Sequence, residues 1–123
     1  MNFKIILLLF LISSCSTSLK NWHRGEDSNS NGVRDDIEKW IKNSTEYSGE
    51  TKKGILKFAK IDPASCDYHH HLKCLENVTD KAFEIQLILL SKFNDTKERQ
   101  AAYQSRVKKC HANDSSLLNF KCQ

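Results

Sequence analysis

The sequence predicts an all-α domain of three to four helices. Apolar residues recur at helical spacing in several successive segments, as a buried helix face requires. No segment alternates apolar and polar residues well enough for a half-buried strand, and the chain has no internal repeat. The chain has 123 residues, so the part expected to fold, residues 27–123, would form a single domain with one modest core.

The first predicted helix begins at Gly32 or Val33 and runs to about Asn43. Its apolar residues fall at positions i, i+4, i+7 and i+8 and form one stripe: Val33, Ile37, Trp40 and Ile41. The second predicted helix covers residues 50–61. Pro63 stops it, because the residue before a proline avoids the helical region.

The third predicted helix covers residues 70–93, and its wide apolar face makes it the expected central helix. A restart follows, where Asp95 can cap the next helix and Glu98 stands three residues later, as in a capping box. The fourth predicted helix covers residues 96–110. It is expected to bury one apolar side: Ala102, Tyr103 and Val107. Cys122 is expected to pin back the tail that follows.

The N-terminal residues are typical of an export signal. Lys4 precedes an apolar run over residues 5–12, which is far shorter than the roughly 20 residues that span a bilayer. Ile12-Ser13-Ser14-Cys15 follows and resembles a bacterial lipobox, in which the cysteine receives lipid and becomes the new N-terminus. We predict a lipoprotein signal peptide at 1–14, a lipid anchor on Cys15 and a flexible tether at 15–26. The alternative is ordinary cleavage between residues 13 and 18, with Cys15 incidental.

The lipobox resemblance implies a bacterial cell envelope, with the membrane as one partner through the lipid on Cys15. Residue 16 is serine rather than aspartate. By similarity to enterobacterial lipoproteins, this implies the outer membrane and a chain that faces the periplasm.

Four further cysteines remain: Cys66, Cys74, Cys110 and Cys122. An even number in an exported chain predicts two disulfides, for which three pairings exist. The sequence favours Cys66–Cys74 and Cys110–Cys122, because each closes a short loop around turn-like sequence. The chief alternative joins Cys66 or Cys74 to the C-terminal segment and would clamp two helices.

Residues 27–38 fit the calcium-loop pattern D-x-[DN]-x-[DN]-G-x5-E at every specified position. Gly32, at loop position 6, permits the sharp turn. The loop supplies about the six to eight oxygens that calcium requires, with no thiol or imidazole among them. The predicted ligands are the side chains of Asp27, Asn29, Asn31, Asp35 and Glu38 and the backbone carbonyl of Val33.

At these 12 residues the chain resembles the EF-hand class of calcium loops. It departs from a full EF-hand at loop position 8, where Arg34 replaces the usual aliphatic residue, and in the short segment before Asp27, which is too broken for an incoming helix. The loop is therefore more similar to the single calcium loops of dockerin or thrombospondin type 3 repeats. It is also similar to small bacterial exported proteins of uncharacterised function that carry an Asn-Gly-Val-Arg-Asp-Asp loop.

Two other interpretations of the polar residues stay open. Asp, Asn, Ser and Gly form turns, and acidic residues favour the first turn of a helix, so a metal-free turn would explain part of the loop pattern. The run His69-His70-His71, between Cys66 and Cys74, suggests a zinc or copper site. Its spacing matches no standard zinc finger, and oxidised cysteines cannot bind a metal as thiolates.

The sequence contains no recognised catalytic motif and no aromatic and basic cluster typical of nucleic-acid binding, although the net charge is +4. We therefore expect a calcium-binding envelope lipoprotein with a structural or partner-binding role, which is not an enzyme and does not bind nucleic acid. One alternative is a small inhibitor or immunity-type protein that blocks an exported enzyme. Another is a transition-metal binder that uses the histidine run.

Overall fold

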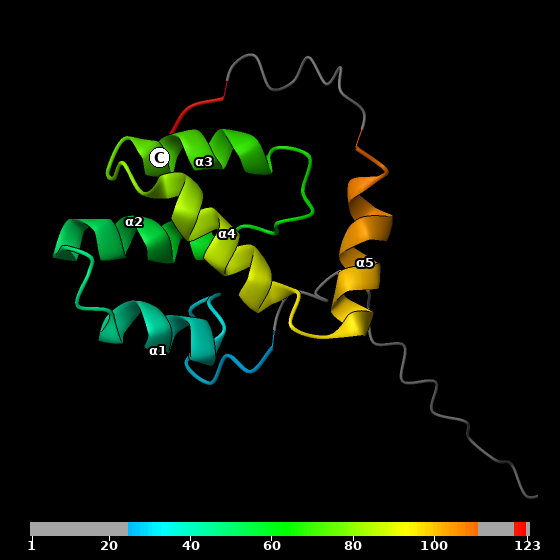
Figure 1. Cartoon of the computed structure of the whole chain (residues 1–123), viewed down its shortest axis with the longest axis horizontal. Coiled ribbons are helices and arrows are strands. Elements are labelled where there is room, and N and C mark those ends of the chain that lie inside the picture. The colour runs from blue at the N-terminus through cyan, green and yellow to red at the C-terminus, as the bar shows by residue number, and fades with distance from the viewer. Residues whose placement is uncertain (1–24, 111–119, 123) are drawn as a thin grey trace, which may run out of the picture.

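The computed structural model describes residues 25–110 and 120–122 and consists, over these residues, of helices and connecting loops without strands. Five helices follow one another in the order α1, α2, α3, α4 and α5 (Figure 1). Their bounds are Asp35–Asn43, Gly49–Ala59, Tyr68–Glu76, Ala82–Phe93 and Lys97–Val107. The prediction of an all-α fold is confirmed, with five helices in place of three to four. No helix within this part of the chain has the length and apolarity needed to cross a membrane.

Helices α1, α2 and α3 lie side by side with α2 in the middle, while α4 runs across them and α5 stands at the edge (Figure 1). One core joins the first four helices. Its largest fully buried side chains come from the loop before α1 and from α1, α2 and α4: Val33, Ile37, Ile41, Ile55, Ile85, Leu89 and Phe93. Trp40 packs against this core and carries Lys92 over its ring, 5.3 Å from the ring centroid, which joins α1 to α4.

Helix α1 confirms the predicted apolar stripe, because Val33 is 1% exposed and Ile37 and Ile41 are fully buried. The helix begins at Asp35, two to three residues later than predicted. Arg34, the residue before it, is still extended at φ −60° and ψ 134°. The three acidic residues in its first turn suit the positive end of the helix dipole: Asp35, Asp36 and Glu38.

Helix α2 begins where the Ser48 side chain accepts a hydrogen bond from the backbone N–H of Thr51, which satisfies one of the free donors of the first turn. It ends at Ala59, close to the predicted stop before Pro63. Gly54 allows a close approach to the end of α3, since a Cβ at this position would lie 2.7 Å from Val78 Cγ2. The absence of a side chain there therefore sets how near α2 and α3 lie.

The single helix predicted over residues 70–93 is wrong: the chain breaks after Glu76 and restarts at Ala82 as α4. An unbroken helix of that length would span about 36 Å and carry half of its apolar face away from the core. In the turn, the Thr79 hydroxyl accepts a hydrogen bond from the backbone N–H of Lys81, and Thr51 of α2 holds the carbonyl of Val78. The break folds α4 back over the other helices. Because α4 buries Ile85, Leu89 and Phe93 but leaves Phe83 and Leu87 exposed, the prediction of a central buried helix is met only in part.

Helix α5 differs from its prediction in both cap and burial. Thr96, not Asp95, caps it, by accepting a hydrogen bond from the Arg99 backbone N–H. None of its residues is buried, and Val107 is 39% exposed. The predicted burial of Ala102, Tyr103 and Val107 is therefore wrong, because their helix packs at the edge of the domain.

The two predicted disulfides are present, but their favoured pairing is wrong. Cys66 bonds to Cys110 and Cys74 bonds to Cys122, with Cα atoms 5.3 and 5.5 Å apart. Helix α3 takes up most of the residues between Cys66 and Cys74, so these two cysteines do not enclose the turn that the favoured pairing assumed. The alternative that clamps distant segments is the one observed. One bond ties the end of α5 to the segment before α3, and the other ties the C-terminal residues to α3.

Candidate metal centre

The first half of the loop folds around the carboxylate of Asp27. Its Oδ1 accepts a hydrogen bond from Asn31 N at 3.1 Å, and its Oδ2 accepts one from Gly32 N at 2.9 Å. Ser30 and Gly32 both adopt positive φ, at 55° and 86°, which turns the chain sharply at these two points. The predicted need for glycine at position 6 of the loop is thereby met.

The second half of the loop brings Asn29 and Asn31 to Glu38. Asn29 Nδ2 donates to Glu38 Oε2 at 3.0 Å, and Asn31 Nδ2 donates to Glu38 Oε1 at 2.7 Å. The amide oxygens accept backbone hydrogen bonds, from Asn31 N at 3.1 Å and from Val33 N at 2.8 Å. Loop positions 3, 5 and 12, which are 9 residues apart at most, therefore lie within hydrogen-bond reach of one another.

Glu38 is also held from its own helix. Lys42, one turn later, places its ammonium 3.0 Å from Glu38 Oε1. This contact, together with the amides of Asn29 and Asn31, keeps the pKa of Glu38 below its ordinary value. The carboxylate is therefore ionised at neutral pH, the form in which it would accept a cation.

Asp35 lies apart from this cluster and closes the other side of the loop. Its carboxylate accepts hydrogen bonds from Ser28 N at 3.1 and 3.2 Å and from Ser28 Oγ at 2.7 Å. Its own backbone N–H donates to the carbonyl of Glu26 at 2.8 Å. The structure thus brings Asn29, Asn31 and Glu38 together and directs Asp27 and Asp35 to hydrogen-bond donors of the loop.

The donor set fits a hard cation by its chemistry. Carboxylates, carboxamide oxygens and a backbone carbonyl are the ligands that calcium prefers, and neither sulfur nor imidazole stands among the loop residues. Within residues 25–110 and 120–122, no three side chains of His, Cys, Asp and Glu gather closely enough to hold a metal ion. Cation binding here would therefore depend on the asparagine oxygens and would replace the contacts that Asn29 and Asn31 donate to Glu38.

Arg34 has a role in this site that the calcium-loop pattern does not predict. It departs from the aliphatic residue typical of loop position 8, yet its side chain is only 5% exposed. Its guanidinium donates to both oxygens of Asp36, at 2.5 and 2.7 Å, to the carbonyl of Lys92 at 2.9 Å and to Asp95 at 3.1 Å. The hydrogen bonds to Asp36 raise the pKa of Arg34 and lower that of Asp36, so both groups are charged.

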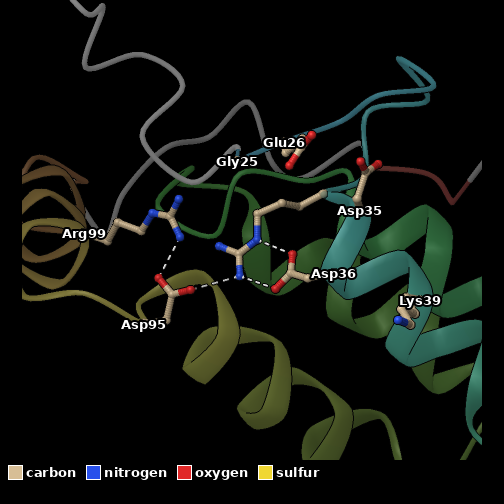
Figure 2. A pocket seen from close by; sticks show the side chains of 8 residues that line it. Gly25, Glu26, Asp35, Asp36, Lys39, Asp95 and Arg99 are labelled. Carbon is tan, nitrogen blue, oxygen red and sulfur yellow. Dashed lines mark hydrogen bonds and ion pairs between the residues drawn. The ribbon is translucent and has the colours of Figure 1, made fainter.

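These contacts lie in a cleft of about 420 Å³ where the loop meets the turn between α4 and α5 (Figure 2). Asp95 lies between Arg99, which binds its Oδ1 at 2.6 Å, and the α1 side of the cleft (Figure 2). Four carboxylates and three cationic side chains line it, together with Gly25: Glu26, Asp35, Asp36, Asp95, Arg34, Lys39 and Arg99. Arg34 pairs there with Asp36 and Asp95, and Arg99 pairs with Asp95, so these contacts link the loop to the α4–α5 turn.

The histidine run does not form a metal cluster with the nearby cysteines. Cys66 and Cys74 are both disulfide-bonded, so neither offers a thiolate. His71 Nε2 lies 3.3 Å from Asp67 Oδ2, and the rings of His70 and His71 pack on Phe120. The described contacts of these rings are thus with Asp67, with Phe120 and with each other.

The predicted signal peptide, the lipid anchor on Cys15 and most of the tether lie outside the described residues. Comparison of this chain with models of known protein families, with curated proteins and with solved structures finds no match.

Proposed function

We propose that this chain is a calcium-binding lipoprotein of the bacterial cell envelope, with a structural or partner-binding role rather than a catalytic one. The observation that carries the proposal is the loop of residues 27–38, in which Asn29 and Asn31 converge on the Glu38 carboxylate. Asp27, Asp35 and the carbonyl of Val33 would supply the remaining oxygens. All of these oxygens would coordinate one divalent cation.

The loop is coupled to the core, and this supports a role for calcium in stability. Val33 ends the turn and is buried, while Glu38 stands on α1 between the buried residues Ile37 and Ile41. A cation that binds both ends of the loop would hold the first turn of α1 against the core. Ligand binding to the folded chain alone raises the free energy of unfolding by mass action.

The envelope location is supported by two independent features. Both disulfides, Cys66–Cys110 and Cys74–Cys122, suit an oxidising compartment. The lipobox-like residues 12–15 supply the proposed membrane anchor at Cys15. We propose a non-catalytic role because the sequence carries no catalytic or phosphate-binding motif of a recognised enzyme class.

Isothermal titration calorimetry of the full chain with calcium tests the proposal. The expected dissociation constant is on the order of 10⁻⁴ to 10⁻³ M, because only three ligands are charged and calcium sites of extracellular modules lie in this range. Zinc is titrated separately. Heat from zinc alone, with none from calcium at millimolar concentration, would overturn the calcium proposal in favour of the histidine run.

The variant Glu38→Ala assigns the binding to the loop. Calcium at about tenfold to a hundredfold above its dissociation constant is expected to raise the Tm of the unchanged chain by about 6 to 20 °C. Glu38→Ala should abolish this rise, because it removes the carboxylate that two asparagines approach. Glu76→Ala, at an exposed carboxylate that ends α3, is the matched control and should keep it. If the Tm of the unchanged chain is the same with calcium and with a chelator, the proposal is contradicted.

A further inference from the structure

A groove separate from the loop opens between α2, α3 and the C-terminal residues 120–122. Its volume is about 880 Å³, within the size range of clefts that bind ligands in proteins. The Cys74–Cys122 disulfide holds the C-terminal residues against α3 at one wall (Figure 1). The groove thus depends on the disulfide pairing of the folded chain.

The floor of this groove is apolar and reachable from solvent. Val78 lines it and is 45% exposed, although it follows directly on the end of α3. Phe120 also lines the groove, where it packs on the rings of His70 and His71. Side chains of an apolar ligand would therefore find both an aliphatic and an aromatic surface.

The rim of the groove is basic. Lys53 and Lys57 on α2 and Lys60 directly after it stand at i, i+4 and i+7, and Lys121 lies in the C-terminal wall. All four are exposed. Lys53 is matched by Glu50, whose carboxylate lies 2.8 Å from its ammonium.

Lys57, Lys60 and Lys121 have no ion-pair partner within residues 25–110 and 120–122. The only other acidic residue of the groove is Asp67, whose carboxylate lies 3.3 Å from His71 Nε2, so the lining carries four lysines against two carboxylates. An excess of positive charge therefore surrounds the apolar floor. A cleft of this kind focuses its potential on the space that a ligand would occupy.

We propose that this groove binds an acidic peptide segment of a partner protein that carries one apolar or aromatic anchor residue. The anchor would lie on Val78 and Phe120, and the flanking carboxylates would face the three lysines. This inference rests on the partner-binding role proposed above and assigns that role to a surface distinct from the calcium loop. An anionic membrane would meet the same lysines, and binding to anionic vesicles is therefore measured as the alternative outcome.

Selection from a displayed library of random dodecapeptides tests the proposal. The full chain, with both disulfides formed and calcium present, is the target. The enriched peptides should combine aspartate or glutamate with a single large apolar residue. A labelled enriched peptide then reports affinity by fluorescence anisotropy, which should weaken as salt rises to about 0.5 M, where the Debye length is only a few ångströms.

Two groove variants and two matched controls locate the binding. The triple variant Lys57→Glu/Lys60→Glu/Lys121→Glu should lower the affinity by roughly tenfold or more, because it reverses the charge of the rim. Val78→Asp should lower it similarly by placing a carboxylate on the floor. The controls keep the wild-type affinity: Lys97→Glu/Lys108→Glu/Lys109→Glu on and beside α5, and Val107→Asp at a comparably exposed valine. All of these positions are exposed, so Tm measurements should show folded variants.

Three results would overturn the proposal: enrichment without acidic residues, equal affinity for groove and control variants, or no enrichment at all. Binding to phosphatidylglycerol vesicles that the groove variants lose, without peptide selection, would assign the surface to the membrane instead. Calcium titration of the same samples separates the two proposals. A chain that binds the peptide but not calcium contradicts only the calcium role, and the reverse result contradicts only the groove.

Discussion

Arg34 and Asp95, 61 residues apart in sequence, meet in a contact of 3.1 Å between guanidinium Nη2 and carboxylate Oδ2. The same nitrogen donates to the carbonyl of Lys92 in the last turn of α4, where a cation suits the negative end of the helix dipole. Arg34 thereby joins the candidate calcium loop to the α4–α5 turn. Its position explains why a charged residue occupies an inward-facing position of the loop.

Removal of the Arg34 side-chain contacts should destabilise the domain. Arg34→Met is expected to lower the free energy of unfolding by about 2 to 3 kcal/mol, because it breaks a buried hydrogen-bonded charge whose partners are partly solvated. Arg99→Met removes the other guanidinium from the same Asp95 carboxylate, but from a more exposed position, and should cost less than about 1 kcal/mol. Urea unfolding of the two variants, with both disulfides intact, measures the two losses of unfolding free energy. Equal losses would contradict a special role for Arg34.

Two glycines, one in the loop and one at the start of α2, should respond differently to substitution by alanine. Gly32→Ala should cost about 1 kcal/mol, because φ is +86° there and left-handed backbone disfavours a Cβ. The nearest side chain to that Cβ, Lys60, would lie at an ordinary 3.7 Å, so the cost is conformational. Gly49→Ala meets nothing within 4 Å and stands in the first turn of α2. It should leave stability unchanged or raise it by about 0.5 kcal/mol, as helix propensity predicts. A neutral Gly32→Ala in urea unfolding would argue against the loop conformation.

Acid should weaken the Arg34–Asp36 contact over a defined pH range. The pKa of Asp36 is lower in the folded chain than its ordinary value of 3.8, chiefly through the hydrogen bond from Arg34. The unfolded chain therefore binds the proton first as the pH falls, and the stability that Asp36 contributes is lost from about pH 4 down through the folded pKa. Urea unfolding of the wild type and of Asp36→Asn should differ at neutral pH, by less than about 1 kcal/mol, and converge in acid. Asp80→Asn, at an exposed carboxylate in the α3–α4 turn, should show no such convergence.

Tryptic digestion tests the disulfide pairing, because cleavage after lysine places the four cysteines Cys66, Cys74, Cys110 and Cys122 in four different peptides. Under non-reducing conditions, peptide 61–73 should be joined to 110–121, and peptide 74–81 to 122–123. Mass spectrometry before and after reduction identifies each pair. Recovery of 61–73 joined to 74–81 would mean that the fold described here is not the one the protein adopts.

The sequence alone determined the features that depend on near neighbours along the chain. The helical spacing of Val33, Ile37 and Ile41 predicted the buried face of α1, and the need for a sharp turn predicted the positive φ of Gly32. The number of disulfides also followed, since the four cysteines other than Cys15 were expected to pair with one another. These features are local or compositional, so no tertiary contact was needed to infer them.

Only the tertiary structure decided the features that depend on which distant segments pack together. The break between α3 and α4 arises because a single long helix would leave its apolar face uncovered, and apolar periodicity alone continues across the turn. The Cys66–Cys110 and Cys74–Cys122 bonds close over 44 and 48 residues, and the Arg34–Asp95 contact closes over 61. Contacts of this range are set by the packing of helices in space, because sequence separation says nothing about which side chains the folded chain brings within reach of one another.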